Sequence, residues 1–400
     1  MTDRKVFENS ISRFISWLDR NGTAGYDPYD LWSTRYGIRA RRMFYRYGKL
    51  AAPMVAPLVL VDRLMPSAAR KGLAKKRYAT SHAHLILAYL DLHSGDFGER
   101  VDLLGEARLL AEELDEIKIA GFSGDCWGYP FDWENRRGLW PKNTPLITVT
   151  PYSFEALLAL YETTGDAIHL ERARSVLNFA THDLNDIERP NGTIASSYSP
   201  LDHSLVINAS AYRAFVLIKG GELFGDTDAK GLGAALFRFV LDSQRANGSW
   251  PYALEAERDD FVDHFHTCFV LKNLAKIFSI SGEAQIGAAI ESGYAFYEEN
   301  LFDGSELPMP FAEGGNRLLR YSMYDFAEAI NLGVLLRDLI PRAFGRAVQV
   351  GLETVERFQL PDGHFVTSVG RTGSSDKLPF IRWPQAQMFH ALASLWRTLN

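Results

Sequence analysis

The sequence predicts an all-α protein whose helices form six hairpins that close into a double ring. Three observations predict it: amphipathic helix patterns recur along the chain, turn signals recur at a nearly fixed interval, and β-strand patterns are few. The clearest turn signals are Asn-Gly or Asp-Gly pairs, at intervals of 56, 56 and 59 residues, with their glycines at Gly192, Gly248, Gly304 and Gly363. Self-similarity at a fixed period is the signature of a repeat architecture. Because stacked repeats share a continuous core, we expect one domain over residues 1–400.

A second set of turn signals, offset from the first, separates one hairpin from the next: Gly95-Asp96, Gly165-Asp166, Gly225-Asp226 and Gly282-Glu283. The first hairpin would pair a helix around Phe7–Leu18 with His82–Leu92. Helical periodicity places the other five at 99–119 with 148–163, 168–186 with 203–223, 229–246 with 262–280, 284–300 with 321–339, and 342–359 with 383–398.

The connections within the predicted hairpins are long, and those between hairpins are short. All long loops are therefore expected at one end of the ring, with the second helix of each hairpin inside. Functional residues concentrate on loops that a rigid scaffold holds in place, so we expect the chemistry at that end. Short strands could occur in the loops, for example over Gly363–Val369.

Residues 23–77 interrupt this rhythm and are interpreted as an insertion within the first hairpin. They contain two basic runs, Arg35–Arg46 and Arg70–Arg77, which could attract a polyanion or an acidic membrane face but are also typical of a solvated surface. Leu50–Val61 is an apolar run of 12 residues with two prolines, too short to span a bilayer. We interpret it as a buried irregular segment, with insertion into a membrane interface as the alternative.

The composition and net charge limit the classes of protein to which the chain can belong. The formal net charge is −6 and the sequence pI is about 6.0, which give no support for nucleic-acid binding. The two cysteines, Cys126 and Cys268, indicate no disulfide framework and fit a reducing compartment. The first residues lack the apolar core and cleavage site of a signal peptide, so we expect a cytoplasmic protein. Nucleotide-binding motifs are absent from the sequence, so a nucleotide-dependent enzyme is unsupported.

Polar and aromatic residues stand at the start of every predicted inner helix, where they would converge on one cavity. The richest cluster is Asp263–Thr267, with His264 and His266. Histidine can act as acid or base near neutral pH, and Asp263 could orient one of the imidazoles. A zinc site is the rival interpretation, but histidines two residues apart point to different sides of a helix, so we expect no metal. The structural alternative is a buried histidine at the helix start.

A second cluster, Gly124–Glu134, lies in the predicted loop of hairpin two. Four aromatic residues alternate there with Asp125, Asp132 and Glu134. Sugar sites commonly combine aromatic stacking faces with carboxylates, and paired carboxylates can hydrolyse glycosidic bonds. The alternative is a rigid lid filled with aromatic side chains, and aromatic residues in the loops could simply cap the helix layers.

Four stretches of the chain resemble a bacterial family encoded with exopolysaccharide and capsule biosynthesis genes, the vibrio polysaccharide (Vps)-type proteins. They are Gly25–Asp30, Cys126–Trp133, Gly248–Tyr252 and Asp263–Thr267. The hairpin pattern resembles the six-hairpin (α/α)6 toroids of carbohydrate-active proteins, and the family is more distantly similar to the helical domain of glucuronyl C5-epimerases. The resemblance implies a role in polysaccharide biosynthesis. The family tends to have a small or amide residue at the position of His264, which favours His266 as a shared catalytic residue.

Two function classes follow. The first is an enzyme that acts on a uronic-acid-containing glycan by C5-epimerase-like acid/base chemistry, with a lyase or a glycoside hydrolase on the same fold as variants. The second is a non-catalytic glycan-binding or assembly subunit of a polysaccharide synthesis complex, which could dock at the inner membrane. Both imply a polysaccharide or oligosaccharide partner and no transmembrane segment.

The candidate catalytic residues are His266, Tyr324, Tyr129 and Asp263. The candidate substrate-binding residues are Trp127, Asp132, Trp133, His203, Trp250, Tyr252, His264, Tyr321, Arg382 and Trp383. Among them, the guanidinium of Arg382 would hold the substrate carboxylate. We expect no metal and no other cofactor, because epimerisation needs only a base, an acid and a cation.

Overall fold

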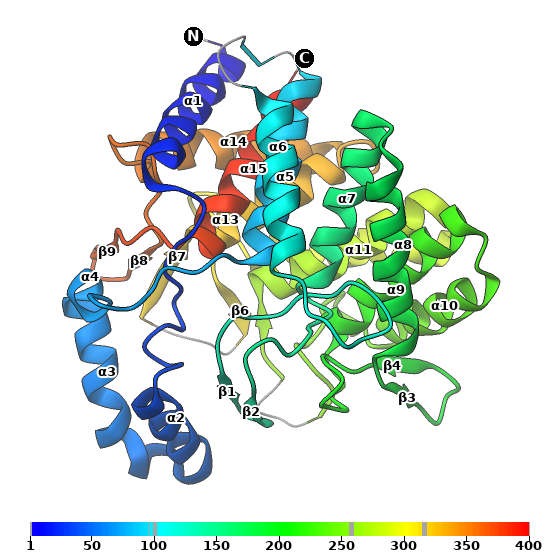
Figure 1. Cartoon of the computed structure of the whole chain (residues 1–400), viewed down its shortest axis with the longest axis horizontal. Helices are drawn as coiled ribbons and strands as arrows, with labels where there is room; N and C mark the ends of the chain where they lie inside the picture. The colour runs from blue at the N-terminus through cyan, green and yellow to red at the C-terminus, as the bar shows by residue number, and fades with distance from the viewer. Residues whose placement is uncertain (1, 96, 99–101, 256–259, 314–317, 400) are drawn as a thin grey trace.

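The computed structural model describes residues 2–95, 97–98, 102–255, 260–313 and 318–399. Its main helices form two concentric rings, which confirms the predicted (α/α)6 toroid (Figure 1). The outer ring comprises α1 (Asp3–Asn21), α6 (Leu103–Glu116), α8 (Ala167–His182), α10 (Thr227–Asp242), α12 (Ala284–Asn300) and α14 (Pro341–Phe358). The inner ring comprises α5 (Ala79–Ser94), α7 (Thr150–Thr164), α9 (Ile207–Phe224), α11 (His264–Ser281), α13 (Met323–Leu335) and α15 (Ala386–Thr398).

Burial explains why the second helix of each hairpin lies inside. The inner helix α9 buries 14 of its 18 residues, whereas the outer helix α14 buries seven of its 18 on one face. A helix that is apolar or small on all sides is stable only when it is surrounded by protein, and a one-sided helix covers a core. The inner ring closes because α15 packs against both α13 and α5.

The long loops lie at one end of the ring, where short antiparallel strands tie them together (Figure 1). Two hairpins form within single loops: β1 (Trp133–Asn135) with β2 (Gly138–Trp140), and β3 (Asp186–Glu188) with β4 (Ile194–Ser196). Two other sheets join loops of neighbouring hairpins: β5 (Val262–Asp263) with β6 (Phe311–Glu313), and β7 (Leu319–Ser322) with β8 (Ser368–Gly370) and β9 (Ser375–Asp376). Of the strand signal at Gly363–Val369, only the last part forms a strand.

The inserted segment forms α2 (Arg35–Tyr47), the 3-10 helix η1 (Gly48–Ala51), α3 (Ala52–Leu64) and α4 (Pro66–Ala69). The prediction that Leu50–Val61 is a buried irregular segment is wrong, because α3 contains no buried residue. Pro53 lies in the first turn, where a helix needs no N–H donor. Pro57 is inside the helix, but the carbonyl it leaves without a donor is that of Pro53, so a single hydrogen bond is lost. In Figure 1, α2 and α3 project at the lower left.

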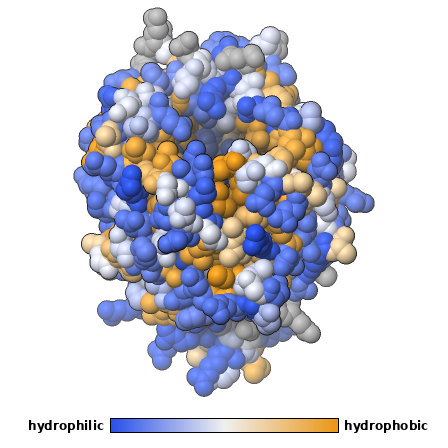
Figure 2. Space-filling model, turned by 90° about the vertical axis from the view of Figure 1, so that its right-hand side faces the viewer, coloured by the Kyte–Doolittle hydropathy of each residue, from blue (hydrophilic) through white to orange (hydrophobic). Residues whose placement is uncertain are grey.

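Some predicted features lie outside the described residues: Asp96 of the second set of turn signals, and 99–101 at the predicted start of hairpin two. None of the described helices combines the length and apolarity that crossing a membrane requires. On the side of the molecule at the right of Figure 1, hydrophilic residues cover most of the surface and apolar residues gather near its middle (Figure 2).

The structural reason for glycine differs between Gly192 and Gly248, which occupy corresponding turns in two successive hairpins. Gly192 and Gly248 both have positive φ angles, of 80° and 90°. A Cβ on Gly192 would meet open space, whereas a Cβ on Gly248 would come within 2.3 Å of the Ser292 carbonyl oxygen on α12. The turn at Gly248 therefore requires glycine both for its conformation and for the close approach of α12.

We expect Gly248→Ala to destabilise the protein more than Gly192→Ala. Alanine in a left-handed conformation costs about 1–2 kcal/mol, and this cost applies to both variants. Only Gly248→Ala also displaces α12, which adds about 1–3 kcal/mol. Chemical denaturation of the two variants gives the comparison directly. Equal losses of unfolding free energy would contradict the role assigned to the contact with Ser292.

Candidate functional site

A cavity of about 300 Å³ opens at the end of the ring where the long loops gather. The starts of the inner helices and the turn before α15 contribute Tyr152, His266, Tyr324, Arg382 and Trp383 to its wall. The loop of hairpin two adds Tyr129 and Trp133, and the loop of hairpin four adds Tyr252. Segments far apart in the sequence thus line one cavity. The sequence predicted such a cavity at the starts of the inner helices.

Aromatic rings form most of the cavity wall. Tyr129 stacks on Phe131 with an interplanar angle of 14°, and Trp133 meets Tyr129 edge to face. On another part of the wall, the Tyr324 and Trp383 ring centroids are 5.0 Å apart. Such flat, rigid surfaces suit a ligand with flat apolar faces, and they lose little conformational entropy on binding.

Asp263 orients the imidazole of His266. Asp263 is the N-cap residue of α11: one carboxylate oxygen accepts from the His266 backbone N–H at 2.9 Å, and the other lies 2.7 Å from the ring atom Nδ1. Because the carboxylate accepts the Nδ1 proton, the lone pair of the neutral ring lies on Nε2. The carboxylate is buried, while 19% of the His266 side chain is exposed, at the cavity. A base oriented in this way is suited to proton abstraction.

His264 has a different environment, two residues earlier in the chain. Its Nδ1 lies 3.2 Å from the Met309 carbonyl oxygen, and its Nε2 accepts from or donates to the Tyr297 hydroxyl at 2.9 Å. Burial lowers the pKa of His264 to about 3, so the ring is neutral at physiological pH. It is a core residue and does not line the cavity. No group of three potential metal ligands occurs within the described part of the chain.

Arg382 is held by a buried carboxylate from the insertion. Both Arg382 and Asp27 are almost fully inaccessible, and Nε and Nη2 of the guanidinium donate to the two oxygens of Asp27. Burial alone would lower the pKa of Arg382, but Asp27 together with Tyr129 and Tyr78 outweighs burial, and the pKa is raised. The guanidinium lies 4.1 Å from the ring centroid of Trp383 and 4.6 Å from that of Tyr129. Its Nη1 donates to the Tyr129 hydroxyl oxygen at 3.4 Å.

A second guanidinium reaches the cavity from α2. Arg41 lies over the rings of Tyr29 and Trp32, at 4.9 and 5.3 Å from their centroids. In the described part of the chain, no carboxylate lies within ion-pair distance of Arg41. Unlike Arg382, it therefore offers the cavity a positive charge that no carboxylate of the described residues pairs with.

The insertion supplies Tyr29, Arg41 and Tyr45 to the wall, a contribution that was not predicted. The available signal was the spacing of Arg41 and Tyr45, which are four residues apart and so share one helix face. Tyr152 and Tyr198 also line the cavity, although neither was among the predicted site residues. Tyr152 stands in the first turn of an inner helix, where the other clusters were found.

Several predicted substrate-binding residues are placed away from the cavity. Trp127 and Trp250 are buried, and their indole N–H groups donate to the carbonyls of Leu114 and Val240 near the ends of outer helices. These tryptophans cap the helix layers, the alternative that the sequence left open for aromatic loop residues. The remaining three do not line the cavity either: Tyr321 donates to Asp303, Asp132 accepts from the Lys142 backbone, and His203 is exposed.

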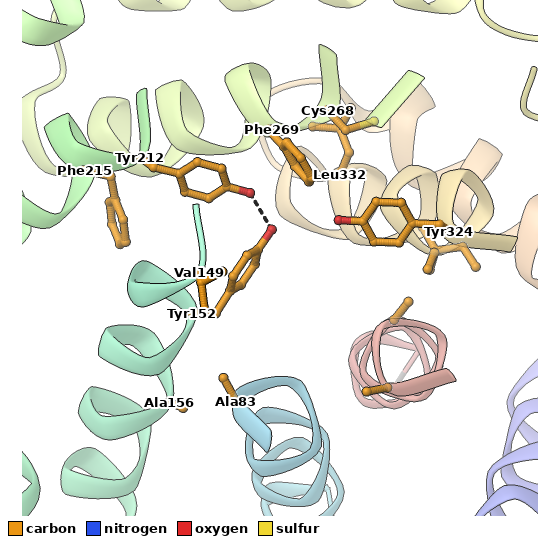
Figure 3. Packing of buried hydrophobic residues seen from close by; sticks show 14 of the residues in the cluster. Ala83, Val149, Tyr152, Ala156, Tyr212, Phe215, Cys268, Phe269, Tyr324 and Leu332 are labelled. Carbon is orange, nitrogen blue, oxygen red and sulfur yellow. Dashed lines mark hydrogen bonds between the residues drawn. The ribbon is translucent and has the colours of Figure 1, made fainter. Parts of the chain in front are cut away.

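Tyr152 and Tyr324, which line the cavity, lie close to Tyr212 in the packed interior (Figure 3). Tyr152 and Tyr212 share a short hydrogen bond, and the hydroxyl of Tyr324 points toward Tyr152. Burial raises the pKa of Tyr324 well above its ordinary value and that of Tyr129 to about 12. These phenols are neutral at physiological pH and can donate hydrogen bonds or protons. Among the described residues that line the cavity, none is Asp or Glu.

Comparison with known proteins supports the fold. No protein-family model matches the sequence, and no curated protein sequence matches it. Solved structures of six-hairpin, glycosidase-like enzymes are similar in fold. An unsaturated glucuronyl hydrolase specific for heparin has a TM-score of 0.64 and 11% identity over 98% of this chain and 97% of its own.

Two further structures show the same likeness. The cellobiose 2-epimerase from Bacillus thermoamylovorans has a TM-score of 0.62 and 12% identity, over 81% of this chain and 88% of its own. The α-1,6-mannanase of Salegentibacter sp., in complex with α-1,6-mannotriose, has a TM-score of 0.55 and 12% identity, over 82% and 90%. At these identities the likeness establishes the (α/α)6 fold.

The environment of His264 predicts how stability depends on pH. Below about pH 6.5 the unfolded chain protonates this histidine, whereas the folded protein resists protonation down to about pH 3. The unfolded state therefore binds more protons, and stability falls as the pH falls. Relative to His264→Gln, the wild-type free energy of unfolding should drop by about 2 kcal/mol between pH 7 and 5. Urea denaturation measures it, with His182→Gln on the surface as the control. A pH-independent difference would refute the assignment.

Proposed function

We propose that the protein acts on a uronic-acid-containing glycan by proton transfer at C5 of the uronic acid, as an epimerase. The observation that carries the proposal is the set of groups in one cavity: an imidazole oriented by a buried carboxylate, neutral tyrosine hydroxyls, and a guanidinium that forms no ion pair with a described carboxylate. This set matches the needs of C5 epimerisation, which are a base, an acid on the opposite face of the sugar ring, and a cation for the carboxylate.

The chemistry follows from the position of each group. The hydrogen on C5 becomes acidic when the charge of the adjacent carboxylate is neutralised, because the electron pair left on C5 then delocalises into the carboxylate. His266 Nε2 removes this proton from one face. A tyrosine hydroxyl returns a proton to the other face, which inverts C5. Tyr129 suits the acid role, because the hydrogen bond from Arg382 stabilises the phenolate that forms when its proton leaves. Tyr324 is the other candidate acid.

Two of the four arginines that line the cavity, Arg382 and Arg41, have different parts in this proposal. The charge of Arg382 is balanced by Asp27, so its role is to position Tyr129 and Trp383 and to polarise the phenol. Arg41 has no such partner in the described structure and is placed to bind the uronate carboxylate. Charge-assisted hydrogen bonds of this kind contribute roughly 1.5–3 kcal/mol.

The substrate class rests on three supports. The aromatic wall suits sugar rings, and the cavity is at the lower end of the size range for small-molecule sites, enough for about one or two sugar units. The structural neighbours include an unsaturated glucuronyl hydrolase and a cellobiose 2-epimerase. The resemblance of four stretches to Vps-type proteins adds a role in exopolysaccharide biosynthesis.

The competing functions are distinguished by the wall of the cavity. Hydrolysis of a glycosidic bond ordinarily uses two carboxylates, and the described lining residues include none. A lyase would use the same base and cation as an epimerase, but would eliminate the group at C4 after removing the C5 proton. The many aromatic side chains favour a second candidate, a non-catalytic glycan-binding subunit, since stacking requires no acid–base pair.

Deuterium exchange at C5 tests the proposal. In heavy water the protein should introduce deuterium at C5 of a polymer of alternating glucuronic acid and N-acetylglucosamine, or of polymannuronic acid, as read by NMR. His266→Ala should reduce the exchange rate by about 10²–10⁴-fold, because it removes the base. Asp263→Asn should have an intermediate effect through the orientation of the ring. His264→Gln is the matched control, which should lower stability and leave the exchange rate per folded molecule nearly unchanged.

Each other result selects a different function. Exchange accompanied by an unsaturated sugar product, detected by its ultraviolet absorbance, identifies a lyase. Binding of the polymers without exchange identifies a glycan-binding subunit. Full activity of His266→Ala would end the assignment of this residue as the base.

Arg41→Ala tests the binding of the carboxylate. We expect kcat/KM on the uronic-acid polymer to fall by about 10- to 150-fold, in line with the loss of a charge-assisted hydrogen bond. The control is Arg39→Ala, an exposed arginine of the same helix that does not line the cavity. Steady-state kinetics of the two variants should therefore differ. An unchanged kcat/KM for Arg41→Ala would show that another cation holds the carboxylate.

A further inference from the structure

The inserted segment 35–77, here called the arm, has an unusual surface. Of the 18 large apolar side chains that are exposed in the described structure, nine belong to the arm. They are Tyr36, Phe44, Tyr47, Leu50, Val59, Leu60, Val61, Leu64 and Met65. Half of the exposed large apolar side chains thus lie in about a tenth of the chain. Concentration of this kind marks an interaction surface, whereas single exposed apolar residues are normal.

The arm is also strongly basic. It contains 12 Lys and Arg residues and one acidic residue, so its formal charge is +11. The whole chain has a charge of −6, and the rest of it therefore has −17. The single acidic side chain, Asp62, lies 2.7 Å from Nη1 of the buried Arg70, so its charge is already balanced. The exposed charges of the arm are Arg35, Arg39, Arg42, Arg46, Lys49, Arg63, Lys71 and Lys75.

Helix α3 is the apolar centre of this surface. Eleven of its 13 residues are uncharged and mostly apolar, and none of the 13 is buried. A helix that is apolar on all sides is normally found in a protein core or in lipid. Its main helical contacts are with α2, η1 and α4, and they include the hydrogen bond from the Tyr36 hydroxyl to the Met54 carbonyl.

The other side of the arm belongs to the cavity. Arg42 of α2 binds both carboxylate oxygens of Glu134 on β1, at 3.1 and 2.9 Å, and Arg41 and Tyr45 line the cavity wall. The arm is thus anchored to the rim of the site on one side and unpartnered on the side that α3 occupies. Figure 1 shows α2 and α3 next to the end of the ring that the loops occupy.

We propose that the arm docks the protein on an anionic membrane surface, with α3 lying in the lipid interface and the basic side chains on the lipid headgroups. Helices that bind at the membrane interface lie in its plane, with their apolar side chains some 5–10 Å deep at the boundary between headgroups and acyl chains and their basic side chains outside it. In the arm, α3 supplies apolar side chains and α2 supplies five of the 12 basic ones. Clustered Lys and Arg residues are attracted to anionic lipids. The arm combines both features, and this inference does not depend on the reaction in the cavity.

Lipid fits the arm better than the other occupants do. A second copy docked symmetrically through the arm would bring two surfaces of formal charge +11 together, which is repulsive. A soluble polyanion would satisfy the basic residues but leave the apolar surface of α3 exposed to water. An anionic lipid surface, which is charged outside and apolar beneath, matches both. Docking there would hold the mouth of the cavity beside the membrane.

Vesicle flotation tests the proposal with the full-length protein. The probes are vesicles of phosphatidylcholine alone and of phosphatidylcholine mixed with phosphatidylglycerol. We expect binding to the mixed vesicles, weakened by added salt, and little binding to phosphatidylcholine alone. Both Leu60→Asp/Leu64→Asp and Arg39→Glu/Arg46→Glu should reduce partitioning about tenfold or more, through lost apolar insertion and lost charge respectively. The matched control is Leu109→Asp/Leu201→Asp, which changes two leucines of similar exposure elsewhere.

Four outcomes would overturn the proposal. The first is the absence of binding to either vesicle. The second is equal binding by the Leu60→Asp/Leu64→Asp variant, which would make the arm a surface for soluble polyanions. The third is equal loss of binding in the control variant. The fourth, read by analytical ultracentrifugation without lipid, is a wild-type oligomer that the leucine variant converts to a monomer. Circular dichroism of each variant verifies that the ring remains folded.

Discussion

The end of the ring that contains the cavity depends on one buried ion pair, between Asp27 and Arg382. Taking two charges out of water is costly, and the pair is stable because both donors and both acceptors are matched. Removing one partner would leave an unpaired buried charge, which typically costs about 3–5 kcal/mol. The pair joins the base of the insertion to the turn before α15. Gly25 packs closely against Ile381 at the same junction. The arm and the cavity wall are therefore held in place by the same contacts.

The ring could be predicted from the sequence because its signals are local and repeated. A glycine such as Gly248 is needed where a turn with a positive φ packs against an outer helix, and the same need returns at Gly363, where a Cβ would come within 2.2 Å of the Arg13 carbonyl oxygen on α1. The insertion has no such repetition. Its apolar run resembles a core segment, and only the three-dimensional structure shows that none of the residues of α3 is buried. Sequence patterns report what a segment is made of, and burial depends on what the remainder of the chain places over it.

The same distinction divides the site residues. The link between Asp263 and His266 is visible in the sequence, because an N-cap carboxylate meets the residue three positions later. Trp127 and Trp250 stand in loops rich in aromatic residues, as sugar-binding tryptophans do, yet their indole groups find partners on outer helices. Those partners are backbone carbonyl groups, and because every residue has one, the sequence does not show which of them will accept the hydrogen bond. The position of Arg41 in the cavity wall likewise could not be predicted without knowing how the insertion folds.

Closure of the ring gives the protein a property that open helical repeats lack. In an open stack each repeat contacts only its neighbours, and a partial stack can fold from one end. Here the first helix, α1, packs against α14 and α15, and α5 also packs against α15. The first helices of the ring therefore find their partners only after α15 has been synthesised. During translation the first hairpin must stay soluble with its inner face uncovered, and it is exposed to aggregation until α15 has left the ribosome.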